Sequence, residues 1–328
     1  MKILALETSC DETSAAVVEG TRVLSNVVAS QIEMHRKWGG VVPEAAARAH
    51  VEALLPTLRE ALSQAETPSE EIGGIAVTNR PGLVGALSVG VTAAKALSLA
   101  WNVPLLGVHH LEGHLSAILA VEPNPVFPFA ALIVSGGHTE LIEVTEWGIY
   151  RVLGGTRDDA AGEAFDKSAR LLGLGYPGGR AIQERARSGN PKRYPLPKGL
   201  KGDTLDFSFS GLKTAVLRLA EKEGDALSIP DAAASLQEAV VAVLSERAAK
   251  AAERGGYRML ALVGGVAANE ALRERLRGEC GRRGIAFVTP PFYLCTDNAG
   301  MIGLAATWRF ERGDRDDLSL EALANAEL

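Results

Sequence analysis

The two halves of the chain repeat one pattern, and this repetition constrains the fold more than any other feature. The apolar stretch in KILALETS (2–9) and the β-branched stretch in SAAVVEG (14–20) lie on either side of the polar TSCDET (8–13), as two strands joined by a tight turn do. Residues 129–156 repeat strand, turn and strand around SGGHTE (135–140) and continue into a third strand. Alternating strand and helix patterns follow both hairpins, so the sequence predicts an internally duplicated α/β protein.

Apolar periodicity and glycine punctuation outline the elements that follow the two hairpins. Pro56 lies inside the first long helical pattern and is expected to kink or end that helix. Expected helices occupy 44–66, 80–102 after a glycine-rich turn, a segment from about 111, 158–173, 269–280 and 297–310, and expected buried strands occupy 73–79, 105–110, 259–265 and 285–290.

This order of elements fits several α/β folds, among them a doubled RNase-H-like architecture such as that of actin, Hsp70 and sugar kinases. In that architecture two duplicated βαβ-type domains enclose a cleft, and their hairpin turns hold nucleotide phosphates from both sides. We expect residues 1–127 with about 298–328 to form the first domain and 128–297 to form the second.

The composition is that of a folded protein with room for two cores. The chain has 328 residues, of which 47% are hydrophobic and 23% charged. The N-terminal apolar run is too short for a signal peptide, and no later apolar run reaches the ~18 residues of a membrane span. Cys10, Cys280 and Cys295 form no CxxC pair. This cysteine usage is typical of a reducing compartment, so we expect a cytoplasmic protein without a membrane partner.

One basic stretch stands out in a chain whose formal net charge is −6. Residues 180–202 carry seven basic side chains against the single acid Glu184. Their proline and glycine content predicts an irregular, exposed segment. Such a segment is either a solvated face or a contact for a polyanion such as a phosphate backbone. The basic residues are Arg180, Arg185, Arg187, Lys192, Arg193, Lys198 and Lys201.

His110 and His114 in GVHHLEGHLSA are spaced as two ligands of one metal ion. On a helix they lie about 40° apart, although two packed histidines can have the same spacing. Glu112 lies about 200° from His110 and so points away from the pair, which argues against the H-E-x-x-H arrangement of a zinc protease. Gly113 weakens the helix by about 1 kcal/mol. Asp297, at the start of a later helix, is expected either only to cap that helix or also to supply a third ligand.

Three glycine-rich turns end strands or open helices: VSGGHTE (134–140), YPGG (176–179) and VGGVAAN (263–269). Their backbone N–H groups can approach a phosphate closely, and together the turns predict a nucleotide site. No G-x-x-x-x-G-K-[ST] motif occurs, which excludes a P-loop mechanism.

Acidic side chains open the helix expected at 158–173. Asp159, Glu163 and Asp166 are spaced i, i+4 and i+7, so they form one stripe on that helix. The stripe either complements the helix dipole or binds ribose hydroxyls.

Eight motifs in register resemble those of the tRNA N6-adenosine threonylcarbamoyltransferase family (TsaD type), formerly called O-sialoglycoprotein endopeptidase. They are ETSCDETSAAVV, HHLEGH, ALIVSGGHTEL, DDAAGEAFDK, GYPGG, FSFSGLKT, GGVAANEALR and CTDNAG, and they span nearly the whole chain. The resemblance implies an actin-like double fold. It also implies transfer of a threonylcarbamoyl group from threonylcarbamoyl-adenylate to N6 of the adenosine 3′ of the anticodon, in tRNAs that read ANN codons, with release of AMP.

The resemblance further implies a set of site residues. His110, His114 and Asp297 match the ligands of one divalent metal ion, Fe²⁺ or Zn²⁺. Asp11 and Glu12 match acidic residues that activity needs. ATP, ADP or AMP is expected to bind in the same cleft as the adenylate. The positions that match contacts to the adenylate are Ile133, Val134, Ser135, Gly136, Gly137, Asp166, Gly179 and Asn269.

The chain departs from the family pattern after YPGG. Many relatives have a proline there and, three residues later, an aspartate on the ribose side, where this chain has Arg180 and Gln183. Gln183 can hydrogen-bond a hydroxyl but carries no charge.

The resemblance implies tRNA, a TsaB-type paralogous protein and a TsaE-type ATPase as partners. Two other functions stay open at this point. The chain could be an actin-like-fold ATPase or small-molecule kinase without tRNA modification activity, or a non-catalytic scaffold.

Overall fold

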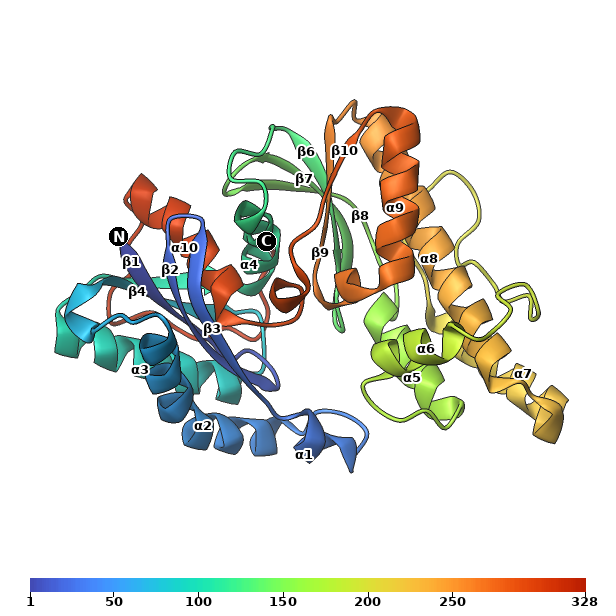
Figure 1. Ribbon diagram of the computed structural model, residues 1–328, viewed down its shortest axis with the longest axis horizontal. Coiled ribbons are helices and arrows are strands. Elements are labelled where there is room, and N and C mark those ends of the chain that lie inside the picture. The colour runs from blue at the N-terminus through green and yellow to red at the C-terminus, as the bar shows by residue number, and fades with distance from the viewer. The chain divides into compact units, whose positions relative to one another are not determined.

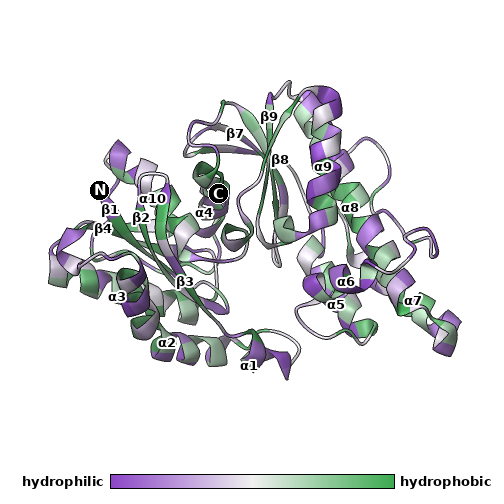
Figure 2. Ribbon diagram, viewed as in Figure 1, coloured by the Kyte–Doolittle hydropathy of each residue, from purple (hydrophilic) through white to green (hydrophobic).

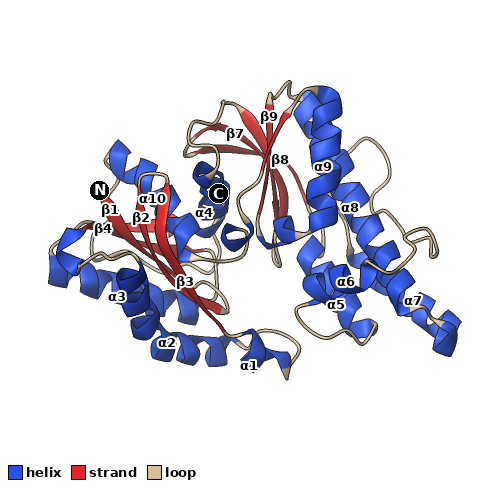
Figure 3. Ribbon diagram, viewed as in Figure 1, coloured by secondary structure: helices blue, strands red, loops and turns tan.

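The computed structural model describes residues 1–328 and divides them into two compact units. Unit 1 contains Met1–Pro125 and Pro290–Leu328, and unit 2 contains Val126–Thr289. Residues 290–297 therefore belong to unit 1, whereas the sequence pattern places them with the second domain. Each unit has one five-stranded sheet accompanied by helices (Figure 1, Figure 3).

The sheet of unit 1 has the strand order β3-β2-β1-β4-β5. Strands β3, β2 and β1 are antiparallel neighbours, whereas β1, β4 and β5 run parallel, so the carboxyl ends of these three meet at one edge. The strands are β1 Lys2–Glu7, β2 Glu12–Glu19, β3 Arg22–Ser30, β4 Ile72–Arg80 and β5 Leu105–His109, and the helices are α1 Ile32–Arg36, α2 Pro43–Gln64, α3 Val84–Trp101, α4 His110–Ser116 and α10 Ala299–Arg312, with short 3-10 helices η1 Ser69–Glu71, η2 Ala117–Ala120 and η5 Phe292–Leu294.

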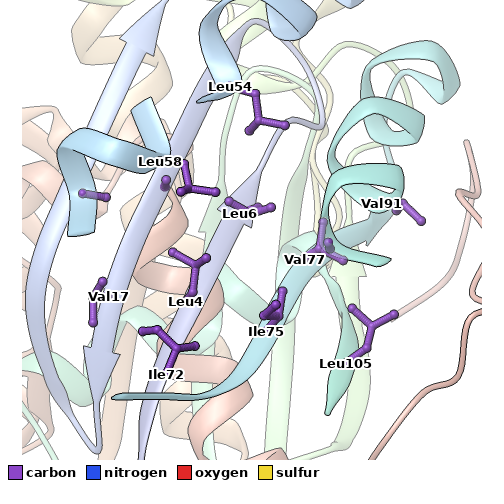
Figure 4. Packing of buried hydrophobic residues seen from close by; sticks show 13 residues of the cluster. Leu4, Leu6, Val17, Leu54, Leu58, Ile72, Ile75, Val77, Val91 and Leu105 are labelled. Atoms are coloured by element: carbon purple, nitrogen blue, oxygen red, sulfur yellow. The ribbon is translucent and has the colours of Figure 1, made fainter. Parts of the chain in front are cut away.

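Alternation along β1 divides its side chains between the two faces of this sheet. Leu4 and Leu6 belong to a buried cluster with Leu58 of α2 (Figure 4). Ala5 points to the opposite face, where a Cβ added to Gly303 of α10 would lie 3.4 Å from the Ala5 Cβ atom. Helices α2 and α3 thus cover one face and α10 the other. Figure 2 shows β1 and β2 green over most of their length, as expected for strands buried on both faces.

Helix α3 differs from the sequence-based expectation about membrane spans. Its 18 residues have a mean hydropathy of 1.4, so by length and composition alone it is apolar enough to cross a membrane. The helix packs on β4 and α2, however, and buries Ala86, Leu87 and Val91. A core helix of a folded domain can pass the same test of length and hydropathy.

The sheet of unit 2 has the strand order β10-β9-β6-β7-β8. Strands β6, β7 and β8 are antiparallel neighbours, and β6, β9 and β10 run parallel. The strands are β6 Phe129–Val134, β7 Thr139–Glu146, β8 Ile149–Gly155, β9 Met259–Val263 and β10 Ala286–Val288, and the helices are α5 Ala161–Leu171, α6 Gly178–Ala186, α7 Ser210–Glu223, α8 Ile229–Arg254 and α9 Glu270–Arg283, with 3-10 helices η3 Gly224–Ala226 and η4 Gly265–Ala268.

The two sheets share one topology, which confirms the predicted duplication. The order β3-β2-β1-β4-β5 corresponds strand by strand to β8-β7-β6-β9-β10. The sequence pattern predicts the third strand of the second half, β8, but not its counterpart β3. Pro56 lies within α2, which continues beyond it to Gln64, so this proline does not end the helix.

Helices α6, α7 and α8 have no counterpart among the predicted elements. The longest of them, α8, begins with Ser228, whose side chain accepts a hydrogen bond from the Asp231 backbone N–H, and has a proline in its first turn. Serine at the cap and proline just inside are ordinary start signals for a helix, so the sequence does contain the information for α8.

Candidate functional site

The predicted histidine ligands lie where the parallel strands of unit 1 end. Strand β5 ends at His109, and α4 begins at His110. The His109 Nδ1 atom accepts a hydrogen bond from Leu111 N at 3.2 Å and so caps α4, while its Nε2 atom lies 3.3 Å from Ala326 O near the C-terminus. His109, to which the sequence assigns no role, therefore fixes the start of the helix that carries both candidate ligand histidines.

Three side chains converge at this edge of unit 1. His110 Nε2 lies 3.4 Å from Asp297 Oδ1, and His114 Nε2 lies 3.3 Å from the same oxygen. The ligand atoms of the three residues all lie within 4.8 Å of one another. Atoms that bind a tetrahedral zinc ion at about 2.0–2.1 Å are roughly 3.3–3.4 Å apart, so the two spacings fit a shared metal ion.

Asp297 reaches the histidines because α10 packs closely on α4. A Cβ on Gly113 would lie 2.6 Å from Ile302 Cδ1, so glycine makes room for α10 at this point. The helix cap is Asn298, whose Oδ1 atom accepts a hydrogen bond from Met301 N at 3.0 Å. The prediction that Asp297 caps the helix is therefore wrong. The neighbouring amide takes the cap, which leaves the carboxylate turned to the histidines.

The electrostatics of the three side chains suit a cation. Burial opposes a charge on His110, but the carboxylates of Asp297 and Glu7 raise the pKa of His110 well above its usual range. Burial favours a neutral Asp297, yet His110 and then His114 hold the pKa of Asp297 well below its usual range. Burial lowers the pKa of His114, and neither of its ring nitrogens makes a well-formed hydrogen bond. A metal ion can satisfy a buried imidazole lone pair that accepts no hydrogen bond. His110, His114 and Asp297 therefore fit a bound divalent metal ion.

The acidic pair Asp11 and Glu12 lies where the turn after β1 enters β2. The Asp11 carbonyl accepts a hydrogen bond from Gln31 N at 3.0 Å, and Glu12 Oε1 accepts one from Ser30 Oγ at 2.9 Å. Burial raises the pKa of both carboxyl groups, that of Glu12 to about 8. Neither side chain belongs to the group of three ligand atoms. Glu12 is nevertheless suited to exchange a proton near neutral pH.

Glu12→Gln is expected to stabilise the fold at alkaline pH. The pKa of Glu12 is 4.5 in a free chain and about 8 in the fold. Between these values unfolding releases a proton, so the free energy of unfolding of the wild type falls as pH rises. Glutamine mimics the neutral acid and lacks this loss. Urea unfolding should show the variant more stable than wild type at about pH 9 and nearly equal at about pH 4. A stability difference between variant and wild type that does not change with pH would contradict the raised pKa of Glu12.

The predicted substrate contacts lie in unit 2. The turn Ser135–Gly137 follows directly on β6, which ends with Ile133 and Val134. Ser135 N donates to His138 O at 2.8 Å, and Ser135 Oγ accepts from His138 N at 3.1 Å, so the turn is closed by two hydrogen bonds. A Cβ on either glycine of the turn would meet nothing within 4 Å, which means that this side of the turn is open to a ligand.

Close backbone approaches connect this turn to its neighbours. A Cβ on Gly162, in the first turn of α5, would lie 2.5 Å from Ser135 O. A Cβ on Gly264, which follows β9, would lie 2.5 Å from Val134 O. Gly178 N donates to Asp166 Oδ1 at 2.7 Å and ties the start of α6 to α5. The structure thus links the serine-glycine turn to Asp166 through α5.

Gly179 and Asn269 open two further helices. Gly179 lies in the first turn of α6, and Asn269 caps α9 with its side chain while its Nδ2 atom donates to Gln237 Oε1 at 3.0 Å. Gln183 Oε1 accepts a hydrogen bond from Glu270 N at 2.8 Å and so links α6 to the start of α9. The glutamine that replaces the family aspartate therefore keeps an acceptor oxygen and uses it on a helix N-terminus.

Two acids of the stripe predicted on α5 form ion pairs with one lysine. The helix begins at Ala161, so Asp159 precedes it. Lys167 Nζ lies 2.8 Å from Asp159 Oδ1 and 2.7 Å from Glu163 Oε1. One lysine thus pairs with two of the three acids, and Asp166 accepts a hydrogen bond from Gly178 N of α6. Ribose binding by the three acids stays a prediction.

The basic stretch 180–202 is exposed as predicted, but it is not irregular throughout. Helix α6 forms its first part, because Ile182 and Ala186 bury one side of that helix. Two of its arginines form ion pairs: Arg180 Nε lies 3.0 Å from Glu184 Oε1, and Arg187 Nη2 lies 3.1 Å from Glu270 Oε2. The other basic side chains of the stretch are also exposed, namely Arg185, Lys192, Arg193, Lys198 and Lys201.

Two buried acids beside the histidines have no role in the sequence-based prediction. Glu112 Oε2 lies 3.5 Å from Arg309 Nη1, as its position away from the ligand face requires. Glu7, the last residue of β1, lies 3.1 Å from His110 Nδ1. Its place in the motif ETSCDET is a signal, but its partner lies 103 positions away in the chain, so no local spacing identifies the pair.

One protein family matches most of the chain. The family described as "TsaD: tRNA N6-adenosine threonylcarbamoyltransferase" matches residues 22–304. A curated relative of that name from Symbiobacterium thermophilum is 54% identical over 98% of this chain and 95% of its own length. Another of that name, from Clostridium botulinum, is 50% identical over 100% of this chain and 98% of its own.

Solved structures with much lower sequence identity share the fold. Full-length HypF in the phosphate- and nucleotide-bound form is 14% identical with a TM-score of 0.62, covering 95% of this chain and 47% of HypF. Component A of the Acidaminococcus fermentans (R)-2-hydroxyglutaryl-CoA dehydratase is 15% identical with a TM-score of 0.59, covering 95% of this chain and 98% of that protein. These likenesses confirm the predicted actin-like fold.

Proposed function

Because the chain belongs to the tRNA N6-adenosine threonylcarbamoyltransferase family, we propose how its residues carry out that reaction. Its substrate is tRNA, and it transfers a threonylcarbamoyl group to N6 of an adenosine. In our proposal the donor is threonylcarbamoyl-adenylate, and the acceptor is the adenosine 3′ of the anticodon in tRNAs that read ANN codons. The N6 amine attacks the carbamoyl carbonyl, the bond from that carbon to the phosphate oxygen breaks, and AMP leaves.

The convergence of His110, His114 and Asp297 on one point carries the proposal for unit 1. These side chains would hold one divalent ion, Fe²⁺ or Zn²⁺, because imidazole and carboxylate ligands suit either metal. When bound, such an ion supplies Lewis-acid polarisation of a substrate oxygen and fixes its position. Three protein ligands leave coordination positions open for that oxygen.

Unit 2 is proposed to bind the adenylate. The backbone N–H groups of Gly136 and Gly137 are proposed to donate to a phosphate or to an oxyanion that develops during transfer, since the Ser135 N–H already donates to His138 O. Ile133, Val134, Asp166, Gly179 and Asn269 complete the proposed contacts. ATP, ADP and AMP contain the same adenylate moiety and are expected to occupy the same residues.

The proton that leaves N6 needs an acceptor, and Glu12 is our proposal for it. Its raised pKa lets the ionised carboxylate take up a proton near neutral pH. Asp11 is the second acidic residue proposed to be needed for activity. The negative charge of Asp11 raises the pKa of Glu12 further.

The exposed basic stretch 180–202 is proposed to contact the tRNA backbone. Replacing Arg187, Lys192 and Arg193 together by glutamine should weaken tRNA binding and make the affinity less dependent on salt. Each lost phosphate contact lowers the slope of log affinity against log salt concentration by roughly 0.7–0.9. Titration of tRNA at several salt concentrations measures that slope.

A matched control removes three exposed arginines from unit 1. Arg22, Arg48 and Arg59 are exposed, and their replacement by glutamine changes the net charge by the same amount. The control should leave the salt slope near the wild-type value. An equal fall in both triple variants would assign the effect to net charge and remove the basic stretch from the proposed tRNA contact.

Partners and location complete the proposal. We expect a TsaB-type paralogous protein and a TsaE-type ATPase to act with the chain, as the family resemblance implies. The cytoplasm, which holds the tRNA substrate, is the proposed location.

An assay with purified components tests the function. The protein is incubated with threonylcarbamoyl-adenylate and tRNA, with and without the two partner proteins, and the nucleosides of the tRNA are analysed. We expect modified adenosine and one AMP per modification. ATP turnover without tRNA modification would instead support the ATPase or kinase alternative, which the named relatives do not favour.

A further inference from the structure

Glu7 is a fully buried carboxylate whose two oxygens both accept hydrogen bonds. Glu7 is the last residue of β1, and its exposed fraction is 0%. Its Oε1 atom accepts the backbone N–H of Ser9, and its Oε2 atom accepts the Thr78 hydroxyl at 2.6 Å. The same Oε2 atom lies 3.1 Å from His110 Nδ1. With donors already on both oxygens, the carboxylate has no need of a proton of its own, so it also accepts from His110 Nδ1–H.

Ser9 Oγ also lies 3.2 Å from His110 Nδ1, but a hydroxyl can donate or accept, whereas the carboxylate only accepts. The Glu7 contact therefore determines which ring nitrogen of His110 is free. With its hydrogen on Nδ1, a neutral imidazole carries its lone pair on Nε2. Nε2 is the atom that lies 3.4 Å from Asp297 Oδ1, on the side of the predicted metal ligands. His114 has no comparable partner, because its Nδ1 atom makes no well-formed hydrogen bond. Orientation by a carboxylate is therefore confined to one histidine of the pair.

We propose that Glu7 is a positioning residue of the metal centre: it accepts the Nδ1–H of His110 and holds that ring with Nε2 turned to the metal. The inference rests on the metal site proposed above. The parallel arrangement of β1, β4 and β5 makes the contact possible, because their carboxyl ends bring Glu7, Thr78 and the start of α4 together. A carboxylate behind a histidine ligand also raises the basicity of that ligand, and its loss costs about 10–100-fold in metal affinity.

Glu7→Gln distinguishes this role from simple packing. The amide has nearly the same shape as the carboxylate but only one acceptor oxygen. The Ser9 backbone N–H cannot reverse its polarity, so the amide oxygen stays there and the amide nitrogen faces Thr78 and His110. The Thr78 hydroxyl can turn and accept. His110 Nδ1–H then keeps only the Ser9 hydroxyl, 3.2 Å away, as an acceptor, or its proton moves to Nε2, where it competes with the metal.

Glu112→Gln is the matched control. Glu112 is a buried glutamate on α4 itself, and it pairs with Arg309 on the side away from the ligands. Zn²⁺ affinity of the full-length wild type and of both variants is measured by competition with a chromophoric chelator. We expect Glu7→Gln to bind Zn²⁺ about 10–100-fold more weakly, and Glu112→Gln to stay within about threefold of wild type.

The outcomes separate this inference from the proposed function. Wild-type affinity in Glu7→Gln, or an equal loss in both variants, overturns the role of Glu7 and leaves the metal site standing. A wild type that binds no Zn²⁺ overturns both. If Glu7→Gln does not fold, ¹⁵N NMR of the imidazoles in the Zn²⁺-loaded wild type decides: a metal on His110 Nε2 with the proton kept on Nδ1 supports the inference, and a metal on Nδ1 overturns it.

Discussion

His110→Ala and Asp297→Ala proteins are expected to bind no metal and to leave tRNA unmodified. Asp297 Oδ1 lies 3.4 Å from His110 Nε2 and 3.3 Å from His114 Nε2, so each variant removes one of three converging ligand atoms. Loss of an outer-shell partner costs about 10–100-fold in metal affinity, and loss of a direct ligand from a three-ligand site should cost more. Elemental analysis of the purified variants gives the metal per chain, and nucleoside analysis of treated tRNA gives the activity.

His35→Ala serves as the control for this experiment. His35 is a fully buried histidine of the same unit, it bonds to Gln31 and to the Val42 backbone N–H, and it is not one of the three ligands. Its loss removes a similar volume from a buried position and should leave the metal content unchanged. Wild-type metal content in both His110→Ala and Asp297→Ala would refute the proposed site.

Gly264→Ala should destabilise unit 2 strongly, because one added methyl group creates both backbone strain and steric overlap. Gly264 has φ 91° and ψ 170°, a region that only glycine adopts readily, and an added Cβ would lie 2.5 Å from Val134 O. The two effects together should lower the free energy of unfolding by roughly 2–6 kcal/mol. Urea unfolding of the variant measures this loss.

Gly256→Ala separates strain from overlap. Gly256 also has a positive φ, 64°, but a Cβ there would meet nothing within 4 Å. Strain alone should cost about 1–2 kcal/mol. Equal losses at the two positions would mean that the contact between Gly264 and the end of β6 does not restrict the chain. Since Val134 precedes the Ser135–Gly137 turn, Gly264→Ala should also weaken binding of AMP.

The duplicated architecture and the candidate metal ligands were accessible from the sequence because both leave regular patterns. The strand, turn and strand pattern around residues 8–13 and 135–140 repeats in the two halves, and its short apolar runs indicate buried strands. The spacing of His110 and His114 reports a shared helix face. Asp297 could be named as a ligand candidate from its place before a helix, although its partners lie far away in the chain.

Local sequence patterns do not encode the contacts that the prediction missed. Asn298, not Asp297, caps α10. Asparagine and aspartate are both good helix caps, so only the packing of α10 on α4 decides between these neighbours. Lys167 forms ion pairs with Asp159 and Glu163. Asp159 precedes α5, because the helix starts later than the run of acidic residues does. Gln183 finds its partner on α9, 87 positions away in the chain. Each outcome depends on tertiary packing.

Unit 1 is discontinuous in the chain, and this has a consequence for the order of events during synthesis. Two ligands of the proposed metal, His110 and His114, precede unit 2, and the third, Asp297, follows it. The ribosome must therefore complete all of Val126–Thr289 before α10 can dock on the sheet of unit 1. Until then the first part of unit 1 has one bare apolar face and an incomplete set of ligands. We therefore expect the proposed metal to bind late in biogenesis, since a nascent chain that stalls within unit 2 has only the two histidines with which to hold an ion.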